Sequence, residues 1–204
     1  MTRLSSPLRA FHVANALTYA SLFAGIGAIA CAAAGRPAGA GASIALAVIS
    51  DTLDGTFARL FGRTETQRAI GVQLDSLSDA IAFGIAPVVC AALASQSNLW
   101  TPLLAVLWWT SAAGYAACAI TRLAFFNLTH EESPGFVGLP VPVAALLWAT
   151  ALLFAPGPAA SIALFATTAA AMVLPLPIPR PSGIGLAAFA CWPMLVVVMN
   201  LVRG

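Results

Sequence analysis

Long apolar runs, separated by short polar or Gly/Pro-rich breaks, make up most of the chain. A helix that crosses a bilayer needs about 20 mostly apolar residues. Seven runs approach or exceed this length: residues 11–34, 39–61, 69–95, 99–121, 139–156, 158–177 and 183–202. Breaks such as Gly35-Arg36-Pro37 and Pro156-Gly157-Pro158 carry typical turn residues. The pattern predicts an all-α polytopic membrane bundle of six to seven transmembrane helices.

Composition excludes several other classes of protein. Hydrophobic residues make up 60% of the chain and charged residues only 8%, against roughly 25% charged in an average soluble domain. Too little charge remains to cover a water-soluble globule, and disorder requires low hydrophobicity. A net charge of +2 is too small to indicate a nucleic-acid partner. The length suggests one membrane domain over residues 1–204, with the first segment retained as a helix rather than cleaved as a signal peptide.

All nine basic residues are arginines, and their placement predicts an orientation. With a cytoplasmic N-terminus, only Arg36 and Arg203 fall on the outer side. The other seven fall on the cytoplasmic side: Arg3, Arg9, Arg59, Arg63, Arg68, Arg122 and Arg180. Cytoplasmic loops of membrane proteins carry such an excess of Lys and Arg. We therefore expect an integral protein of the cell membrane with a cytoplasmic N-terminus, whose residues 1–10 fit either an interfacial segment or a disordered terminus.

Four carboxylates lie inside the second and third apolar segments, where charge is costly. Asp51 and Asp54 are three residues apart, and Asp75 and Asp79 are four apart. Both spacings place the pair on one face of a helix. A short connection makes the two helices antiparallel neighbours. We therefore expect all four carboxylates to converge near the cytoplasmic end of this helix pair.

An all-oxygen cluster of this kind is typical of a site for hard divalent cations, one ion or a pair. A cation pathway through a transporter and a structural clasp between helices remain alternatives. Small residues accompany the acids, namely Gly55, Ala58 and Gly71. They leave space for a ligand or permit close packing of helices, and spacing does not separate these two roles.

The segment 51–79 closely resembles the signature of the CDP-alcohol phosphotransferase family. Asp51-Thr-Leu-Asp54-Gly55-Thr-Phe-Ala58-Arg59 is followed, after eleven residues, by Gly71-Val-Gln-Leu-Asp75-Ser-Leu-Ser-Asp79. This matches DxxDGxxAR…GxxxDxxxD at every fixed position. The gap before Gly71 is about three residues longer than is usual in the family. We expect the additional residues in a turn over Phe61–Arg68, on the headgroup side of the site.

Further stretches resemble the phosphatidylserine synthase branch, so that the resemblance covers roughly residues 10–150. They are Asn15-Ala16-Leu17-Thr18, Leu74–Asp79 with Ala82–Pro87, Arg122-Leu123-Ala124-Phe125-Phe126-Asn127, and Phe136–Pro142. This chain departs from the pattern of that branch at three positions. Ser78 stands where the branch usually has Ala, Ala82 stands where it usually has Ser, and Phe125 stands where Arg is expected.

The resemblance implies transfer of a phosphatidyl group from CDP-diacylglycerol to L-serine, with release of CMP, by a homodimer. It implies Mg²⁺ or Mn²⁺, two ions per site, and Asp79 as general base. The implied metal ligands are Asp51, Asp54, Asp75 and Asp79. The implied nucleotide-binding residues are Gly55, Ala58, Arg59 and Gly71.

The sequence leaves more than one role open for each of two arginines, and more than one alcohol open as the acceptor. Arg59 contacts nucleotide or lies at the membrane interface. Arg122 holds an anionic substrate group or caps the end of the fourth helix. Inositol phosphate, glycerol phosphate, choline and other alcohols remain alternative acceptors, and a cation transporter is the alternative outside this class of enzyme.

Overall fold

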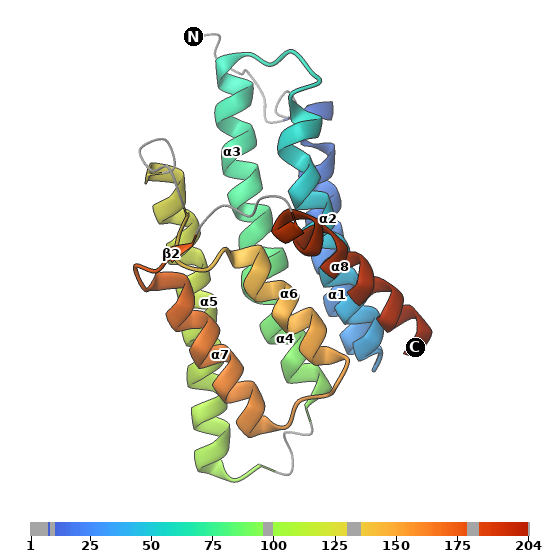
Figure 1. Cartoon of the computed structure of the whole chain (residues 1–204), viewed down its shortest axis with the longest axis vertical. Coiled ribbons are helices and arrows are strands. Elements are labelled where there is room, and N and C mark those ends of the chain that lie inside the picture. The colour runs from blue at the N-terminus through green and yellow to red at the C-terminus, as the bar shows by residue number, and fades with distance from the viewer. Residues whose placement is uncertain (1–7, 9–10, 96–99, 130–135, 179–183, 204) are drawn as a thin grey trace.

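The described residues form a bundle of eight α-helices, shown in Figure 1. The computed structural model describes residues 8, 11–95, 100–129, 136–178 and 184–203. A 3₁₀ turn (Val13–Asn15) leads into α1, and a two-stranded antiparallel ribbon pairs Phe136 with Ile178. The elements are α1 (Ala16–Ala33), α2 (Pro37–Ala58), α3 (Glu65–Asp79), α4 (Ala86–Ala94), α5 (Pro102–Thr129), β1 (Phe136–Val137), α6 (Val141–Leu152), α7 (Pro158–Val173), β2 (Pro177–Ile178) and α8 (Ile184–Arg203).

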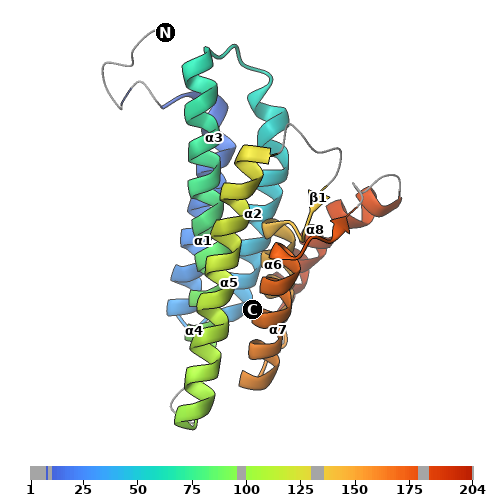
Figure 2. The same cartoon turned by 90° about the vertical axis from the view of Figure 1, so that its left-hand side faces the viewer.

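Each of the seven predicted apolar segments contains helix, which confirms the helical membrane bundle. The third segment holds two labelled helices, because a π-helical turn (Ala80–Ile85) joins α3 to α4 in one rod from Glu65 to Ala94. This rod follows the long axis of the molecule (Figures 1 and 2). Three helical stretches are long and apolar enough to cross a membrane in the part of the chain that the structure describes: Val13–Ala33, Glu65–Ala94 and Pro102–Leu128.

Several boundaries differ from the predicted ones for local reasons. The helix α3 begins at Glu65 rather than 69, because Thr64 and Gln67 form a capping box over its first turn. Only residues 59–64 therefore connect α2 to α3, so the predicted turn over Phe61–Arg68 is wrong in its second half. In contrast, α7 is shorter than predicted. It ends at Val173 instead of continuing to 177, since Leu174 precedes a proline and adopts an extended conformation.

The π-helical turn directly after Asp79 is supported from α5. Pro87 has no N–H, so it cannot donate to the carbonyl of Phe83 four residues earlier. The buried Tyr115 hydroxyl of α5 donates to that carbonyl at 2.8 Å. Gly25 of α1 lets the same turn approach closely, because a Cβ there would lie 2.7 Å from the Cα of Ala82. The segment that carries Asp79 is thus held from two sides.

The core combines small residues with one aromatic cluster. The helix α2 packs against α1, α6 and α8, while α5 packs mainly against α7. Trp108, Tyr115, Trp148 and Phe165 are fully buried and join α5, α6 and α7. The rings of Trp148 and Phe165 stack with 3.9 Å between centroids. Alanines dominate the contacts around α2, which allows its acidic segment to lie close to its neighbours.

The start of α1, the end of α2 and the start of α3 lie together at one end of the bundle (Figure 1). The 59–64 connection at this end contains Arg59 and Arg63, and Arg68 lies in the first turn of α3. The connections after α1 and α6 lie toward the opposite end. Arg3, Arg9 and Arg180, and most of the predicted interfacial segment 1–10, fall outside the described residues.

Candidate metal centre

Three of the four predicted carboxylates meet where α2 faces α3. Asp51 of α2 and Asp75 and Asp79 of α3 each offer a carboxylate oxygen, and these oxygens all lie within 4.8 Å of one another. Asp79 is only 7% exposed, while the other two are half-buried. The convergence expected from the three- and four-residue spacings is therefore present for these three residues.

Asp54, the fourth carboxylate, lies beside this cluster and is tied to α1. The Thr18 hydroxyl donates to Asp54 Oδ2 at 2.6 Å. Asp54 Oδ1 is buried and has no hydrogen-bond partner within the described part of the chain. Buried polar atoms in native proteins nearly always have a partner. This oxygen is therefore available to a ligand that the protein alone does not supply.

The electrostatics of the cluster fit a cation. At an effective dielectric constant of about 20, two unit charges at this separation repel by about 3 kcal/mol. Such repulsion is relieved when a divalent cation binds between the carboxylates. All the available donors are oxygens, which suits Mg²⁺, Mn²⁺ or Ca²⁺ rather than a soft metal. The donor set and the unpartnered oxygen of Asp54 both fit a divalent ion held mainly by α2 and α3.

A cavity of about 190 Å³ opens beside the carboxylates, and the three predicted small residues line it. The lining consists of Asn15, Asp51, Asp54, Gly55, Ala58, Arg63, Gly71, Val72 and Asp75. A Cβ at Gly55 would meet only Arg59 Nη1, at an ordinary 3.8 Å. The face of α2 at Gly55 is therefore open to a ligand rather than packed against another helix.

Gly71 makes room for polar groups rather than for a helix. A Cβ at this position would lie 3.2 Å from Asn15 Oδ1 and 3.3 Å from Arg63 Nη1. Both atoms belong to residues of the cavity wall. Of the two roles that the sequence left open for the small residues, the space at Gly55 and Gly71 thus favours ligand access over helix packing.

Neither of the two predicted arginines is among the described residues that line the cavity. Arg59 is exposed, and its Nη2 donates to the Thr56 hydroxyl at 3.1 Å. Arg122 is 8% exposed, and its Nη2 lies 3.5 Å from the carbonyl of Gly138. It lies seven residues before the end of α5 at Thr129, so the alternative of a helix-end cap is wrong. Its Nε has no partner among the described residues.

Two polar residues of the first helical segment belong to the site, although sequence analysis gave them no role there. Asn15 is 3% exposed and lines the cavity, and Thr18 holds Asp54. Ser78, a departure from the pattern of the phosphatidylserine synthase branch, donates to the Thr18 carbonyl at 2.9 Å and so joins α3 to α1. The only available signal was the Asn15–Thr18 stretch, which contains no residue with an obvious metal or catalytic chemistry.

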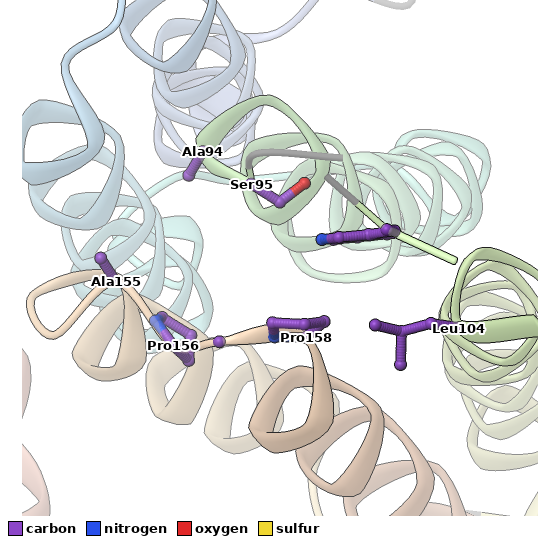
Figure 3. A pocket seen from close by; sticks show the side chains of 8 residues that line it. Ala94, Ser95, Leu104, Ala155, Pro156 and Pro158 are labelled. Atoms are coloured by element: carbon purple, nitrogen blue, oxygen red, sulfur yellow. The ribbon is translucent and has the colours of Figure 1, made fainter. Parts of the chain in front are cut away.

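A larger cavity, of about 390 Å³, lies at the opposite end of the bundle. Figure 3 shows Leu104 of α5 facing Pro158 of α7, with Ser95 at the end of α4 nearby. The described lining residues carry no ionisable side chain, and the Ser95 hydroxyl donates to its own helix at Ala92 O. Its described wall therefore offers no charged group of the kind that phosphoryl chemistry requires.

Comparison with known proteins places the carboxylate cluster in context. Residues 11–176 match the model of the CDP-alcohol phosphatidyltransferase family. A CDP-diacylglycerol–serine O-phosphatidyltransferase of Mycobacterium tuberculosis is 34% identical over 139 residues, which cover 65% of this chain and 46% of that protein. The enzyme of the same name from Methanocaldococcus jannaschii is 39% identical over 104 residues, or 51% of this chain and 45% of that protein.

An archaetidylserine synthase of Methanothermobacter thermautotrophicus is 39% identical over 105 residues, covering 50% of this chain and 40% of that protein. The chain thus spans less than half the length of each of these three relatives. The matched family region includes all four carboxylates, the cavity residues and Arg122.

Proposed function

The chain belongs to the CDP-alcohol phosphatidyltransferase family, and from this we propose that it transfers a phosphatidyl group from CDP-diacylglycerol to L-serine and releases CMP. One observation carries the proposal: Asp51, Asp75 and Asp79 converge beside a cavity walled by Gly55 and Gly71. The serine acceptor is supported by the relatives named phosphatidylserine and archaetidylserine synthases. Residues 1–204 form one catalytic membrane domain in this proposal.

The reaction is a substitution at the phosphorus that carries the lipid. The serine hydroxyl oxygen forms a bond to this phosphorus, and the bond to the oxygen bridging the two phosphates breaks. CMP departs with that oxygen, and the hydroxyl proton passes to a base. Asp79 serves as this base because its carboxylate is deeply buried beside Asp51 and Asp75 at the site.

Asp51, Asp54, Asp75 and Asp79 hold the metal in this proposal, as two ions of Mg²⁺ or Mn²⁺. Bound metal supplies charge stabilisation for the diphosphate and the developing charge on the departing oxygen. Asp54 joins the set through its free Oδ1, while Thr18 fixes its other oxygen. Gly55, Ala58 and Gly71 provide the wall against which the cytidine nucleotide lies, with Arg59 at its exposed rim.

Arg122 holds an anionic group of the acceptor side, the serine carboxylate or the lipid phosphate. Support comes from its burial, its unpartnered Nε and its place beside Gly138, which brings together two stretches that are far apart in the sequence. The protein works as a homodimer in the cell membrane. The site faces the cytoplasm, because the connection nearest to it carries Arg59 and Arg63.

The decisive experiment measures CMP release by the purified protein in lipid nanodiscs. The donors are ester- and ether-linked CDP-lipids, the metal is Mg²⁺ or Mn²⁺, and L-serine is compared with inositol phosphate, glycerol phosphate and choline. We expect metal-dependent CMP release with serine, and none from the Asp75→Asn variant. Release with another acceptor alone would reject serine but keep the reaction. Folded, metal-binding protein that releases no CMP with any acceptor would reject the transferase proposal.

A further inference from the structure

We propose that Arg63 binds the diphosphate of the CDP-linked substrate through its guanidinium group. The inference rests on the proposed function, because it assigns one residue to the nucleotide diphosphate of the same site. It depends on a residue outside the family signature, within the connection that is longer here than is usual. Three observations on the structure lead to it.

The first observation is the position of the guanidinium group. Arg63 lies in the connection between α2 and α3, yet its side chain lines the carboxylate cavity and is half-buried. Its Nη1 approaches to 3.3 Å of the point where a Cβ of Gly71 would stand. The guanidinium therefore lies over the small-residue face of α3, in the space left by the missing side chain.

The second observation is the charge of the cavity wall. Asp51, Asp54 and Asp75 line it, and Arg63 is the one cationic side chain among the described lining residues. A nucleoside diphosphate brings further negative charge into this acidic cavity. A guanidinium matches phosphate oxygens by two parallel hydrogen bonds, which makes it a suitable partner for a diphosphate.

The third observation is the local structure that holds Arg63. Thr64 follows it directly and caps α3, with its hydroxyl accepting from Gln67 N at 3.3 Å and its own N–H donating to Gln67 Oε1 at 2.9 Å. This capping box fixes the backbone next to Arg63 at the entrance of the cavity. Binding a diphosphate then requires less ordering of the chain than a free loop would.

Arg68 offers a matched control in the same region. It is an exposed arginine in the first turn of α3, and it is not among the described residues that line the cavity. Loss of its charge alters the field at the membrane surface without altering the cavity wall. The Arg68→Gln variant therefore separates a direct contact from a general effect of positive charge.

The test compares wild type, Arg63→Gln, Arg63→Lys and Arg68→Gln in nanodiscs of uncharged lipid. Binding of CDP and of cytidine is measured by calorimetry with Mg²⁺ or Mn²⁺ present, and kinetics with CDP-diacylglycerol and serine follow. A hydrogen bond to a charged group contributes about 1.5–3 kcal/mol, which corresponds to at least about tenfold in affinity.

For Arg63→Gln we expect about tenfold weaker CDP binding and a similar rise in the KM for CDP-diacylglycerol. Cytidine binding, the KM for serine and the thermal stability without nucleotide should stay close to wild type. Arg63→Lys should lie between the two, and Arg68→Gln should match wild type. Unchanged CDP binding in Arg63→Gln, or an equal loss of CDP and cytidine binding, would overturn the inference.

The two proposals fail separately in this design. A wild-type protein that binds CDP but releases no CMP with serine contradicts the proposed function, while the CDP affinities still decide the role of Arg63. A wild-type protein that turns over serine, with Arg63→Gln equal to it in CDP affinity and in KM, contradicts only the role of Arg63. A fall in CDP affinity for Arg68→Gln as large as that for Arg63→Gln would likewise overturn the direct contact.

Discussion

At the scale of single residues, the four acids meet different neighbours although the sequence presents them as two equivalent pairs. Spacing along α2 and α3 predicted that they share a side, and the structure confirms this for Asp51, Asp75 and Asp79. The bond between Thr18 and Asp54 joins residues 36 positions apart. No local pattern predicts such a bond, because it depends on how α1 and α2 cross.

Removal of the Thr18 hydroxyl should weaken metal binding. In the Thr18→Val variant Asp54 loses the donor at 2.6 Å that fixes its Oδ2. Outer partners of metal ligands typically contribute 10–100-fold to metal affinity or activity. We expect the Mg²⁺ or Mn²⁺ concentration for half-maximal CMP release to rise about tenfold. Direct titration of the metal by calorimetry, without substrate, should show the same shift.

Two variants control this measurement. Thr18→Ser keeps the hydroxyl and should restore most of the metal affinity. Thr167→Val removes an exposed hydroxyl that bonds within its own helix at Ala163 O, so it should leave the metal titration unchanged. A Thr18→Val variant with wild-type metal affinity would show that Asp54 needs no support from α1.

Replacement of Asp79 should separate chemistry from substrate binding. In the Asp79→Asn variant the side chain keeps its size but no longer accepts a proton, and a positioned base typically contributes about 10²–10⁴-fold to rate. We expect CMP release to fall by at least about 100-fold, while CDP-diacylglycerol binding stays within a few-fold of wild type. Rapid-quench measurement of CMP and equilibrium binding of CDP-diacylglycerol provide the two readouts. Loss of turnover and binding together would make Asp79 mainly a metal ligand.

At the scale of helices, each α-helix that the structure describes overlaps an apolar segment predicted from hydropathy, but several helix ends differ from the predicted ones. The capping box at Thr64 was readable in the sequence and adds one helical turn before residue 69. The continuation of α5 to Thr129 was not readable from hydropathy, since the Arg122–Asn127 stretch is only partly apolar. Because α5 continues to Thr129, Arg122 lies inside the bundle. Its burial there depends on tertiary contacts and not on the polarity of the surrounding stretch.

The stability of the helix packing around α2 should fall strongly when Gly41 is replaced by alanine, and hardly change when Gly27 is replaced. A Cβ at Gly41 would lie 2.8 Å from the carbonyl of Ala149 and 2.9 Å from Asn200 Oδ1, so it collides with both α6 and α8. We expect Gly41→Ala to destabilise the protein by about 1–3 kcal/mol, the usual cost of overpacking. At Gly27 of α1 a Cβ would meet nothing within 4 Å.

The Gly27→Ala variant is therefore the matched control for Gly41→Ala. It should leave stability unchanged or raise it by up to about 1 kcal/mol, because alanine favours helix over glycine. Thermal unfolding in detergent, followed by tryptophan fluorescence and by size-exclusion chromatography, compares the two variants. Equal melting temperatures would contradict the close crossing of α2 with α6 and α8.

At the scale of the whole molecule, the sequence predicted the class of fold because apolar length alone specifies membrane helices. The residues that surround the site in three dimensions were harder to predict from the sequence. The side chains of Asn15 and Arg63 both lie next to Gly71. Asn15 directly precedes α1, and Arg63 lies in the connection before α3. Neither residue is marked by a charge inside an apolar run, which was the signal that identified the acids.

The orientation of the bundle gives the last prediction. The end that holds the candidate metal centre also holds the arginine-bearing 59–64 connection, while the α6–α7 connection lies at the opposite end (Figure 1). We expect Gly62 to face the cytoplasm and Gly157 to face the other side, because the excess of arginine marks the cytoplasmic side. Each glycine has open space around its Cβ position, so cysteine fits at both.

Labelling of single cysteines in intact cells measures this orientation. The four native cysteines, of which Cys90 is buried in the core, are first replaced by alanine. In this background a membrane-impermeant maleimide should label the Gly157→Cys variant in intact cells, and the Gly62→Cys variant only after the membrane is opened. Retained CMP release by both variants confirms their fold. The reverse labelling pattern would place the carboxylates on the outer side, out of reach of a donor and a serine supplied from the cytoplasm.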